Sequence, residues 1–80
     1  MKWLYDHKHD IWRARKSHLL YRISPVYHDR HLLQLVHPPN NRRELLFVGP
    51  LHLCKLTAIR HARACQLVEA KVAEYQNQKD

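Results

Sequence analysis

Apolar and polar residues alternate with a period of two over much of the first half of the chain, which is the spacing of side chains on the two faces of a β-strand. The clearest segment places Leu19, Tyr21 and Ile23 on one face. Arg22 lies on the opposite face, and Pro25 is expected to end the strand because it has no amide hydrogen to donate to a sheet. Strands are predicted at residues 11–16, 19–23, 31–37 and 44–48.

The second half of the chain has a helical pattern. Gly49-Pro50 marks the boundary, since proline fits the first position of a helix, where its missing amide hydrogen is not needed. Between Leu51 and Tyr75 there is neither glycine nor proline, and strong helix formers dominate. We expect an α+β fold in a single domain, residues 1–80, with an antiparallel meander of three to four strands followed by one long C-terminal helix. Its parts are an N-terminal segment at 1–10, the β-meander at 11–48 and the helix at 50–75.

The predicted helix has two apolar sides. The side expected to face the sheet has mostly small side chains, which let a helix lie close to a sheet. It consists of Cys54, Ala58, Ala62, Cys65 and Val72, flanked by Leu51, His61 and Val68. The other side consists of Leu53, Leu56 and Leu67, interrupted by Arg60 and Arg63. An exposed leucine stripe is unfavourable on a small domain. Three explanations are open: the N-terminal segment covers it with Trp3, Leu4 and Tyr5, it forms a homodimer or partner surface, or it is scattered exposure without a function.

Positive charge is concentrated in the predicted sheet. The chain has a formal net charge of +7, and the stretch from Trp12 to Arg43 holds seven Lys and Arg residues against one acid, Asp29. These seven are Arg13, Arg15, Lys16, Arg22, Arg30, Arg42 and Arg43. We expect Arg22 on the open face of the sheet, and Arg42 and Arg43 at the tip of a Pro/Asn-rich loop at 37–43. The charge fits an ordinary solvated face, a surface for nucleic acid, alone or in a nucleoprotein complex, or a surface for an acidic protein.

Patterns typical of catalysis or metal binding are sparse. His7 and His9 are weak candidates for metal ligands, because no third ligand follows at a standard spacing. His61 and Cys65, one helical turn apart, fit a core thiol beside a hydrogen-bonded histidine better than a nucleophilic pair. The single glycine excludes a glycine-rich nucleotide loop. We therefore expect no enzyme activity, no cofactor and no bound metal.

The cysteines and the N-terminal residues indicate the cellular setting. Cys54 and Cys65 on one helix are separated by a rise of about 16 Å, which is too far for a disulfide. Residues 1–8 lack the apolar run of a secretion signal, and no stretch approaches the ~20 apolar residues of a membrane span. We expect a protein of the reducing cytoplasm, which is the host cytoplasm if a phage encodes it, with no membrane partner.

One order of elements in the chain resembles that of small phage and prophage accessory proteins. It is carried by Trp12, Tyr21-Arg22-Ile23, Leu33-x-Leu35, Phe47-Val48-Gly49 and the helical alanines Ala58, Ala62 and Ala64. Anti-CRISPR proteins are among the proteins of this type, and the resemblance spans residues 11–73. It implies a non-enzymatic inhibitor that docks on a host nucleic-acid-handling complex. A weaker likeness, to the sheet-plus-helix arm domains of phage integrases, implies that Arg13, Arg15 and Arg22 face DNA.

Three functional hypotheses follow, and the least favoured of them is a metal-dependent enzyme built on His7 and His9. In the first, the chain docks on a host nucleoprotein complex through its basic sheet and loop and inhibits it, as the resemblance implies. In the second, the chain is a DNA- or RNA-binding module, which could act as a homodimeric regulator through Leu53, Leu56 and Leu67.

Overall fold

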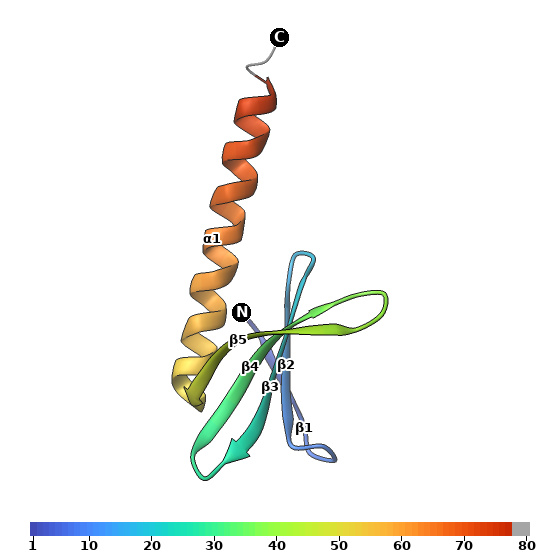
Figure 1. The fold of residues 1–80 in the computed structure, drawn as a ribbon, viewed down its shortest axis with the longest axis vertical. Coiled ribbons are helices and arrows are strands. Elements are labelled where there is room, and N and C mark those ends of the chain that lie inside the picture. The colour runs from blue at the N-terminus through green and yellow to red at the C-terminus, as the bar shows by residue number, and fades with distance from the viewer. Residues whose placement is uncertain (78–80) are drawn as a thin grey trace.

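The computed structural model describes residues 1–77 and shows an antiparallel sheet followed by one long helix (Figure 1). The elements are β1 Trp3–Asp6, β2 Ile11–Lys16, β3 Leu19–Tyr27, β4 Arg30–His37, β5 Arg42–Pro50 and α1 Leu51–Asn77. Each strand pairs with the one before it in sequence, so the sheet order is β1-β2-β3-β4-β5. The α+β meander with a C-terminal helix is confirmed, and the sheet has five strands instead of the three to four expected.

The additional strand is β1, which lies in the N-terminal segment. Trp3 pairs with Ala14, and Asp6 pairs with Ile11, so the first ten residues form a hairpin with β2. The Asp6 carboxylate accepts hydrogen bonds from the backbone amides of Lys8 and His9, at 3.0 and 3.4 Å. A side-chain turn of this kind closes the hairpin without glycine or proline. The polar stretch after Asp6 therefore contains a turn that composition alone did not indicate.

Two strands are longer than the alternation predicted. β3 continues through Pro25 to Tyr27, with an irregularity in its pairing to β4 between these two residues. β5 begins at Arg42, so Arg42 and Arg43 are strand residues instead of the loop tip that was expected. Their side chains consequently point to opposite faces of the sheet.

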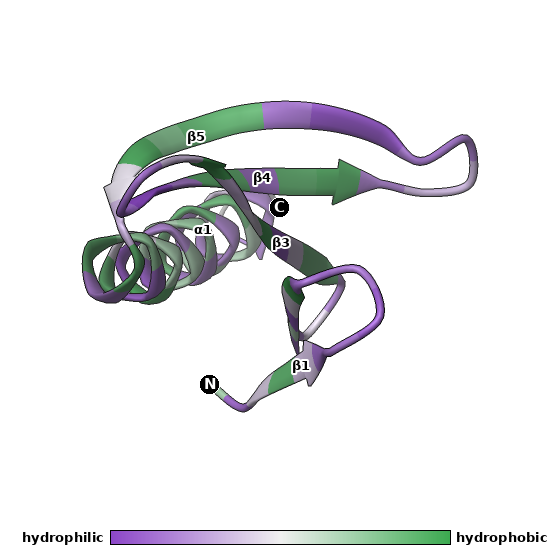
Figure 2. Ribbon diagram, turned by 90° about the horizontal axis from the view of Figure 1, so that it is seen from below, coloured by the Kyte–Doolittle hydropathy of each residue, from purple (hydrophilic) through white to green (hydrophobic). Residues whose placement is uncertain are grey.

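The core lies between α1 and one face of the sheet (Figure 2). Tyr21, Ile23 and Leu33 are almost completely buried on the sheet side. Cys54 and Ala58 meet them from the helix, and Ala62 extends the same row. The small helical side chains let α1 approach the strands closely, as the sequence predicted. The other face of the sheet is not covered by any element of the described chain.

The C-terminal part of α1 extends beyond the sheet (Figure 1). Val68 and Val72 were expected to face the sheet, but they are 61% and 49% exposed. Val68 and Val72 are exposed because α1 is longer than the sheet and continues beyond the last helical side chain that the sheet covers. The molecule is consequently elongated, with extents of 53 × 25 × 20 Å.

The outer side of α1 is also open. The N-terminal segment does not cover Leu53, Leu56 and Leu67, because it pairs with β2 as a strand of the sheet. Of the three explanations offered for this leucine stripe, coverage by Trp3, Leu4 and Tyr5 is therefore wrong. Among residues 1–77, no helix combines the length and the apolar character needed to cross a membrane.

Candidate functional site

The face of the sheet that α1 leaves open carries arginines from three strands. Arg13 in β2 is paired directly with Arg22 in β3. Across β4, Arg43 in β5 is paired with Val36. Because Tyr21 points to the helix, these alternate positions point away from it. Strands in a sheet are about 4.8 Å apart, so the three positions lie within a strip about 15 Å wide. We refer to Arg13, Arg22 and Arg43 as the arginine cluster.

Arg22 is the central member of the arginine cluster. Its Nη1 donates a hydrogen bond to Oε1 of Gln34 at 3.1 Å, which fixes the guanidinium over β4. Partial burial, followed by the charges of Arg43 and Arg13, lowers the pKa of Arg22 below its ordinary value. Like charges facing each other across strands are destabilising. The sheet therefore maintains a repulsion that a bound anion would remove.

Arg13 is partly neutralised by an acid from β1. Its Nη1 donates to Oδ2 of Asp6 at 3.1 Å, and Nδ1 of His9 lies 2.9 Å from the same oxygen. The hydrogen bond from His9 and, to a smaller extent, that from Arg13 lower the pKa of Asp6 to about 2. Asp6 is therefore a carboxylate at neutral pH. It competes with any external anion for Arg13, but it does not contact Arg22 or Arg43 in the described structure.

Two adjacent hollows give the arginine cluster its shape. The first has a volume of about 230 Å³ and is lined by Arg13, Arg22, Val36, Asn41 and Arg43. The second, of about 280 Å³, shares part of this lining and adds apolar side chains, among them Leu4 and Leu20. Arg15 also lines the second hollow, opposite Leu20 in the register. The open face thus combines fixed positive charge with shallow apolar depressions.

The structure separates the seven basic residues predicted for the site. Arg13, Arg15, Arg22 and Arg43 lie together on the open face. Lys16 lies on the other side, where it lines a hollow with Arg63 of α1. Arg30 begins β4 and pairs with Tyr27 at the opposite end of the sheet. Arg42 pairs with His37, and by alternation its side chain lies on the face of the sheet that α1 covers.

Three partners of the arginine cluster were not identified from the sequence. Gln34 holds Arg22, Asp6 holds Arg13, and Asn41 lines the hollow beside Arg43. Alternation did place Gln34 on a face opposite to Leu33, which was a usable signal. The position of Gln34 directly across from Arg22 depends on the register between β3 and β4, which alternation does not determine.

The histidines proposed as weak metal ligands have other contacts. His9 is paired with Asp6, and the His7 ring packs edge-on against Tyr5 with their centroids 4.6 Å apart. Within residues 1–77, no three His, Cys, Asp or Glu side chains are grouped closely enough to hold a metal ion. On the helix, Cys65 Sγ lies 3.8 Å from His61 Nδ1, and the same nitrogen is 2.7 Å from the Tyr21 hydroxyl. The Tyr21–His61 contact joins the helix to the sheet.

Comparisons with known proteins do not place the chain in a family. No protein family matches it, and neither the curated proteins nor the solved structures include a significant match.

Proposed function

We propose that this chain is a non-enzymatic protein that binds the phosphate backbone of nucleic acid with the open face of its sheet. The observation that supports this most strongly is the arginine cluster, in which Arg13, Arg22 and Arg43 converge from three strands around one hollow. A guanidinium binds phosphate oxygens through two parallel hydrogen bonds, and it keeps its charge when partly buried. The net charge of +7 adds long-range attraction to a polyanion.

The arginine cluster is preorganised for phosphate binding. Arg22 is fixed by Gln34 before any ligand arrives, so little side-chain freedom is lost on binding. A phosphate between Arg22 and Arg43 would also offset the repulsion between these two guanidinium groups, which after burial is the next largest cause of the lowered pKa of Arg22. A strip about 15 Å wide is long enough to meet several successive phosphates of one strand.

Binding to labelled DNA and RNA, measured by fluorescence anisotropy over a range of salt concentrations, tests this proposal. We expect binding at about 50 mM salt that weakens as salt increases, because each neutralised phosphate adds about −0.9 to the logarithmic slope for duplex DNA and about −0.7 for single strands. Arg43→Glu should weaken binding by about tenfold or more. Arg42→Glu is the matched control, because it makes the same charge change at the adjacent residue on the opposite face.

Two results would overturn the proposal. One is the absence of binding to duplex and single-stranded DNA and RNA at low salt. The other is an equal loss of binding in Arg42→Glu and Arg43→Glu, which would mean that only total charge matters and that the arginine cluster is not a site.

A second candidate function is docking on a host nucleoprotein complex, with inhibition of that complex. The observation that favours it is the apolar part of the second hollow, where Leu4, Leu20 and Val36 lie among the arginines. Phosphate binding does not need these side chains, whereas protein interfaces are enriched in arginine beside apolar contacts.

Leu20→Asp separates the two candidate functions, because it adds a polar group to the apolar hollow. If the chain docks on a nucleoprotein complex, the intact chain captures a nucleic-acid-handling complex from nuclease-treated bacterial lysate and inhibits it. Leu20→Asp then abolishes this capture. If the chain binds nucleic acid directly, nuclease treatment removes all captured protein. Retention of capture by Leu20→Asp contradicts a role for the apolar hollow.

A further inference from the structure

The side of α1 that covers the sheet continues beyond it without interruption. Apolar or small residues, with His61 as the exception, follow each other at alternating steps of three and four along this row. The row is Leu51, Cys54, Ala58, His61, Cys65, Val68, Val72 and Tyr75. Its first five members are buried or partly buried, but Val68, Val72 and Tyr75 are 61%, 49% and 62% exposed. The sequence thus specifies an apolar row that is longer than the sheet that covers it.

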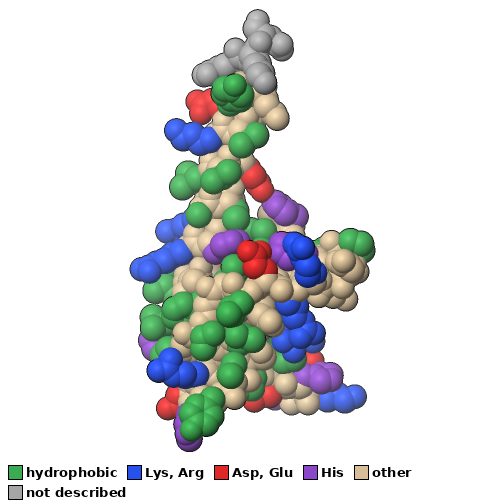
Figure 3. All heavy atoms as spheres, in the orientation of Figure 1, with side chains coloured by type: hydrophobic (Ala, Val, Ile, Leu, Met, Phe, Trp, Pro, Cys, Tyr) green, Lys and Arg blue, Asp and Glu red, His purple; other side chains and the backbone are tan. Residues whose placement is uncertain are grey.

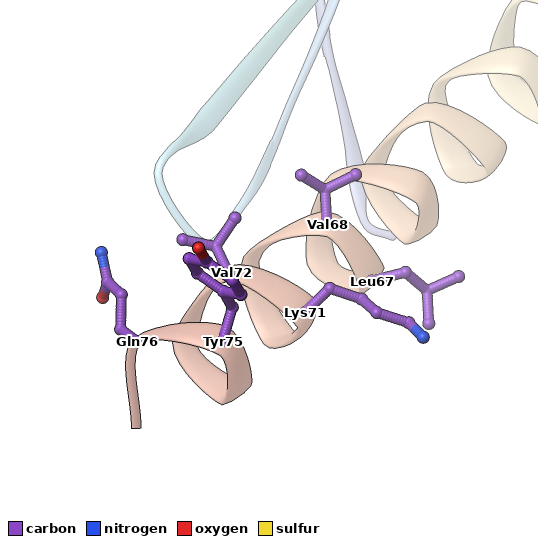
Figure 4. Close-up of a pocket in the computed structure, with 6 residues that line it drawn as sticks. All are labelled: Leu67, Val68, Lys71, Val72, Tyr75 and Gln76. Carbon is purple, nitrogen blue, oxygen red and sulfur yellow. The ribbon is translucent and has the colours of Figure 1, made fainter. Parts of the chain in front are cut away.

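The projecting part of α1 carries a shallow apolar groove. The groove has a volume of about 430 Å³, and its lining comes from three successive turns of the helix (Figure 4). The lining residues are Leu67, Val68, Lys71, Val72, Tyr75 and Gln76. Figure 3 shows hydrophobic side chains exposed along this projection and farther down the same helix. At the proximal end, Leu53 and Leu56 are 37% and 39% exposed.

The chain exposes more surface than a compact monomer of its mass would. The chain exposes 6230 Å², whereas a compact monomer of its mass is expected to expose about 5,100 Å². The difference, on the order of 1,000 Å², is similar to the ~800 Å² that each subunit buries in a stable interface. The radius of gyration is 14.8 Å, compared with about 12 Å for a compact domain of this length.

We propose that a second copy of this chain covers the exposed face of α1, and that the two helices pack antiparallel. If the two-fold axis passes near Ala64, Tyr75 of one copy lies opposite Leu53 of the other, because both side chains point to the same side of α1 as Ala64. Both exposed ends of the helix are then covered at once. The small side chain of Ala64 lets the two helices approach closely at the axis.

The charges on α1 favour this orientation. Residues 51–65 contain the bases Lys55, Arg60 and Arg63 and no acid, whereas residues 66–77 contain Glu69 and Glu74 with one base, Lys71. Lys55 lies over the Trp12 ring and Glu69 pairs with His18 of the same chain, so neither faces a second copy. Antiparallel packing places the half of one helix with Arg60 and Arg63 beside the half of the other with Glu74. Parallel packing would place each base beside its own copy, which costs free energy. Antiparallel packing also opposes the two helix dipoles.

Mass measurement by light scattering after size-exclusion chromatography tests the proposal. We expect the intact chain to move from 9.7 kDa towards twice that mass between about 1 and about 200 µM. Val68→Glu and Val72→Glu should remain monomeric throughout, because a buried unpaired carboxylate opposes association. Ala70→Glu is the control, because Ala70 is exposed on the side of α1 away from the groove. Circular dichroism checks that all four proteins are equally helical.

Cross-linking tests the orientation. In a Cys65→Ser background, the double variant Leu53→Cys, Tyr75→Cys should form an intermolecular disulfide between positions 53 and 75, identified by peptide mass spectrometry. Each single cysteine variant should not cross-link at its own position. Cross-links from 53 to 53 or from 75 to 75 would overturn the antiparallel arrangement.

A chain that is monomeric at every concentration would overturn the homodimer. So would an unchanged dimer in Val68→Glu and Val72→Glu, or binding of a different protein by a monomeric chain through this groove. These outcomes are independent of the nucleic-acid proposal, because the groove on α1 and the arginine cluster share no residue.

Discussion

The Tyr21 hydroxyl and Nδ1 of His61 lie 2.7 Å apart and form a hydrogen bond that joins the middle strand of the sheet to α1. Tyr21 is only 1% exposed, so its hydroxyl depends on this partner. Burial, with a smaller contribution from Cys65, raises the pKa of Tyr21 to about 12. A neutral phenol at ordinary pH is a donor, and we therefore assign the donated hydrogen to Tyr21.

Removal of this hydroxyl should destabilise the fold. We expect Tyr21→Phe to lower the free energy of unfolding by about 1–2 kcal/mol, because His61 loses its partner at the helix–sheet boundary. Urea denaturation followed by circular dichroism measures the change. Tyr27→Phe is the control, because Tyr27 is 67% exposed, and it should change stability by less than about 0.5 kcal/mol. Equal effects of the two substitutions would mean that the hydrogen bond contributes nothing specific.

Alkaline pH should have a related effect. The pKa of Tyr21 is higher in the folded state than its ordinary value of 10.0, so its contribution to stability is complete below pH 10. That contribution is lost as the pH rises through about 12, because the unfolded state releases the proton first. The pKa values of Tyr5 and Cys54 are also raised, so the intact protein loses stability from several groups. Tyr21→Phe should make the loss between pH 10 and 12 measurably smaller. An unchanged pH profile would contradict this assignment.

The single glycine occupies a position with little space. A Cβ atom on Gly49 would lie 2.7 Å from Cε2 and 2.9 Å from Cζ of Phe47. Phe47 packs against the core, so its ring has to move. We expect Gly49→Ala to reduce stability by about 1–3 kcal/mol.

A thermodynamic cycle checks that this effect comes from the phenylalanine ring. Gly49→Ala in a Phe47→Leu background should cost clearly less than Gly49→Ala alone, because the smaller side chain leaves the new methyl group free. Additive effects of the two substitutions would show that the strain lies elsewhere.

Asp6 should restrain nucleic-acid binding, because it occupies Arg13. Asp6→Asn removes a negative charge beside the arginine cluster, and we expect roughly twofold to fivefold tighter binding at low salt, with the gain shrinking as salt increases. Anisotropy titrations measure it. Asp29→Asn, which makes the same charge change in the β3–β4 turn, is the control and should have less effect. Weaker binding by Asp6→Asn would mean that Asp6 positions Arg13 for the ligand.

Acid should also lower the stability of the fold, through Asp6. The folded pKa of Asp6 is about 2, below its ordinary value of 3.8. The stabilisation from its contacts with His9 and Arg13 is therefore present above pH 3.8 and is lost as the pH falls through about 2. NMR titration of the Asp6 side chain should show this low midpoint, and a midpoint near 3.8 would contradict the contacts.

The sequence predicted the features that depend on periodicity. Tyr21 and Ile23 were assigned to one strand face and Arg22 to the other, and the small residues Cys54 and Ala58 were assigned to the sheet-facing side of the helix. These assignments require only a period of two or of 3.6, which burial of one face makes visible.

Features that depend on pairing between segments could not be predicted in this way. The strand at Trp3 was missed because the turn after it is formed by the Asp6 side chain. The separation of Arg42 from Arg43 depends on where β5 begins. The exposure of Val72 depends on the length of the sheet compared with that of the helix. None of these quantities is encoded in a local pattern.

The neighbour-to-neighbour order of the strands also determines how the chain folds. Every strand pair closes a short turn, so loop-closure entropy is small and the sheet can assemble hairpin by hairpin during synthesis. The helix is made after the sheet, and until it leaves the ribosome the face that carries Tyr21, Ile23 and Leu33 is exposed to water. A chain that stops before Leu51 is therefore a sheet with one exposed apolar face and two unpaired edges, which is prone to aggregate. By covering the apolar face, α1 reduces this tendency.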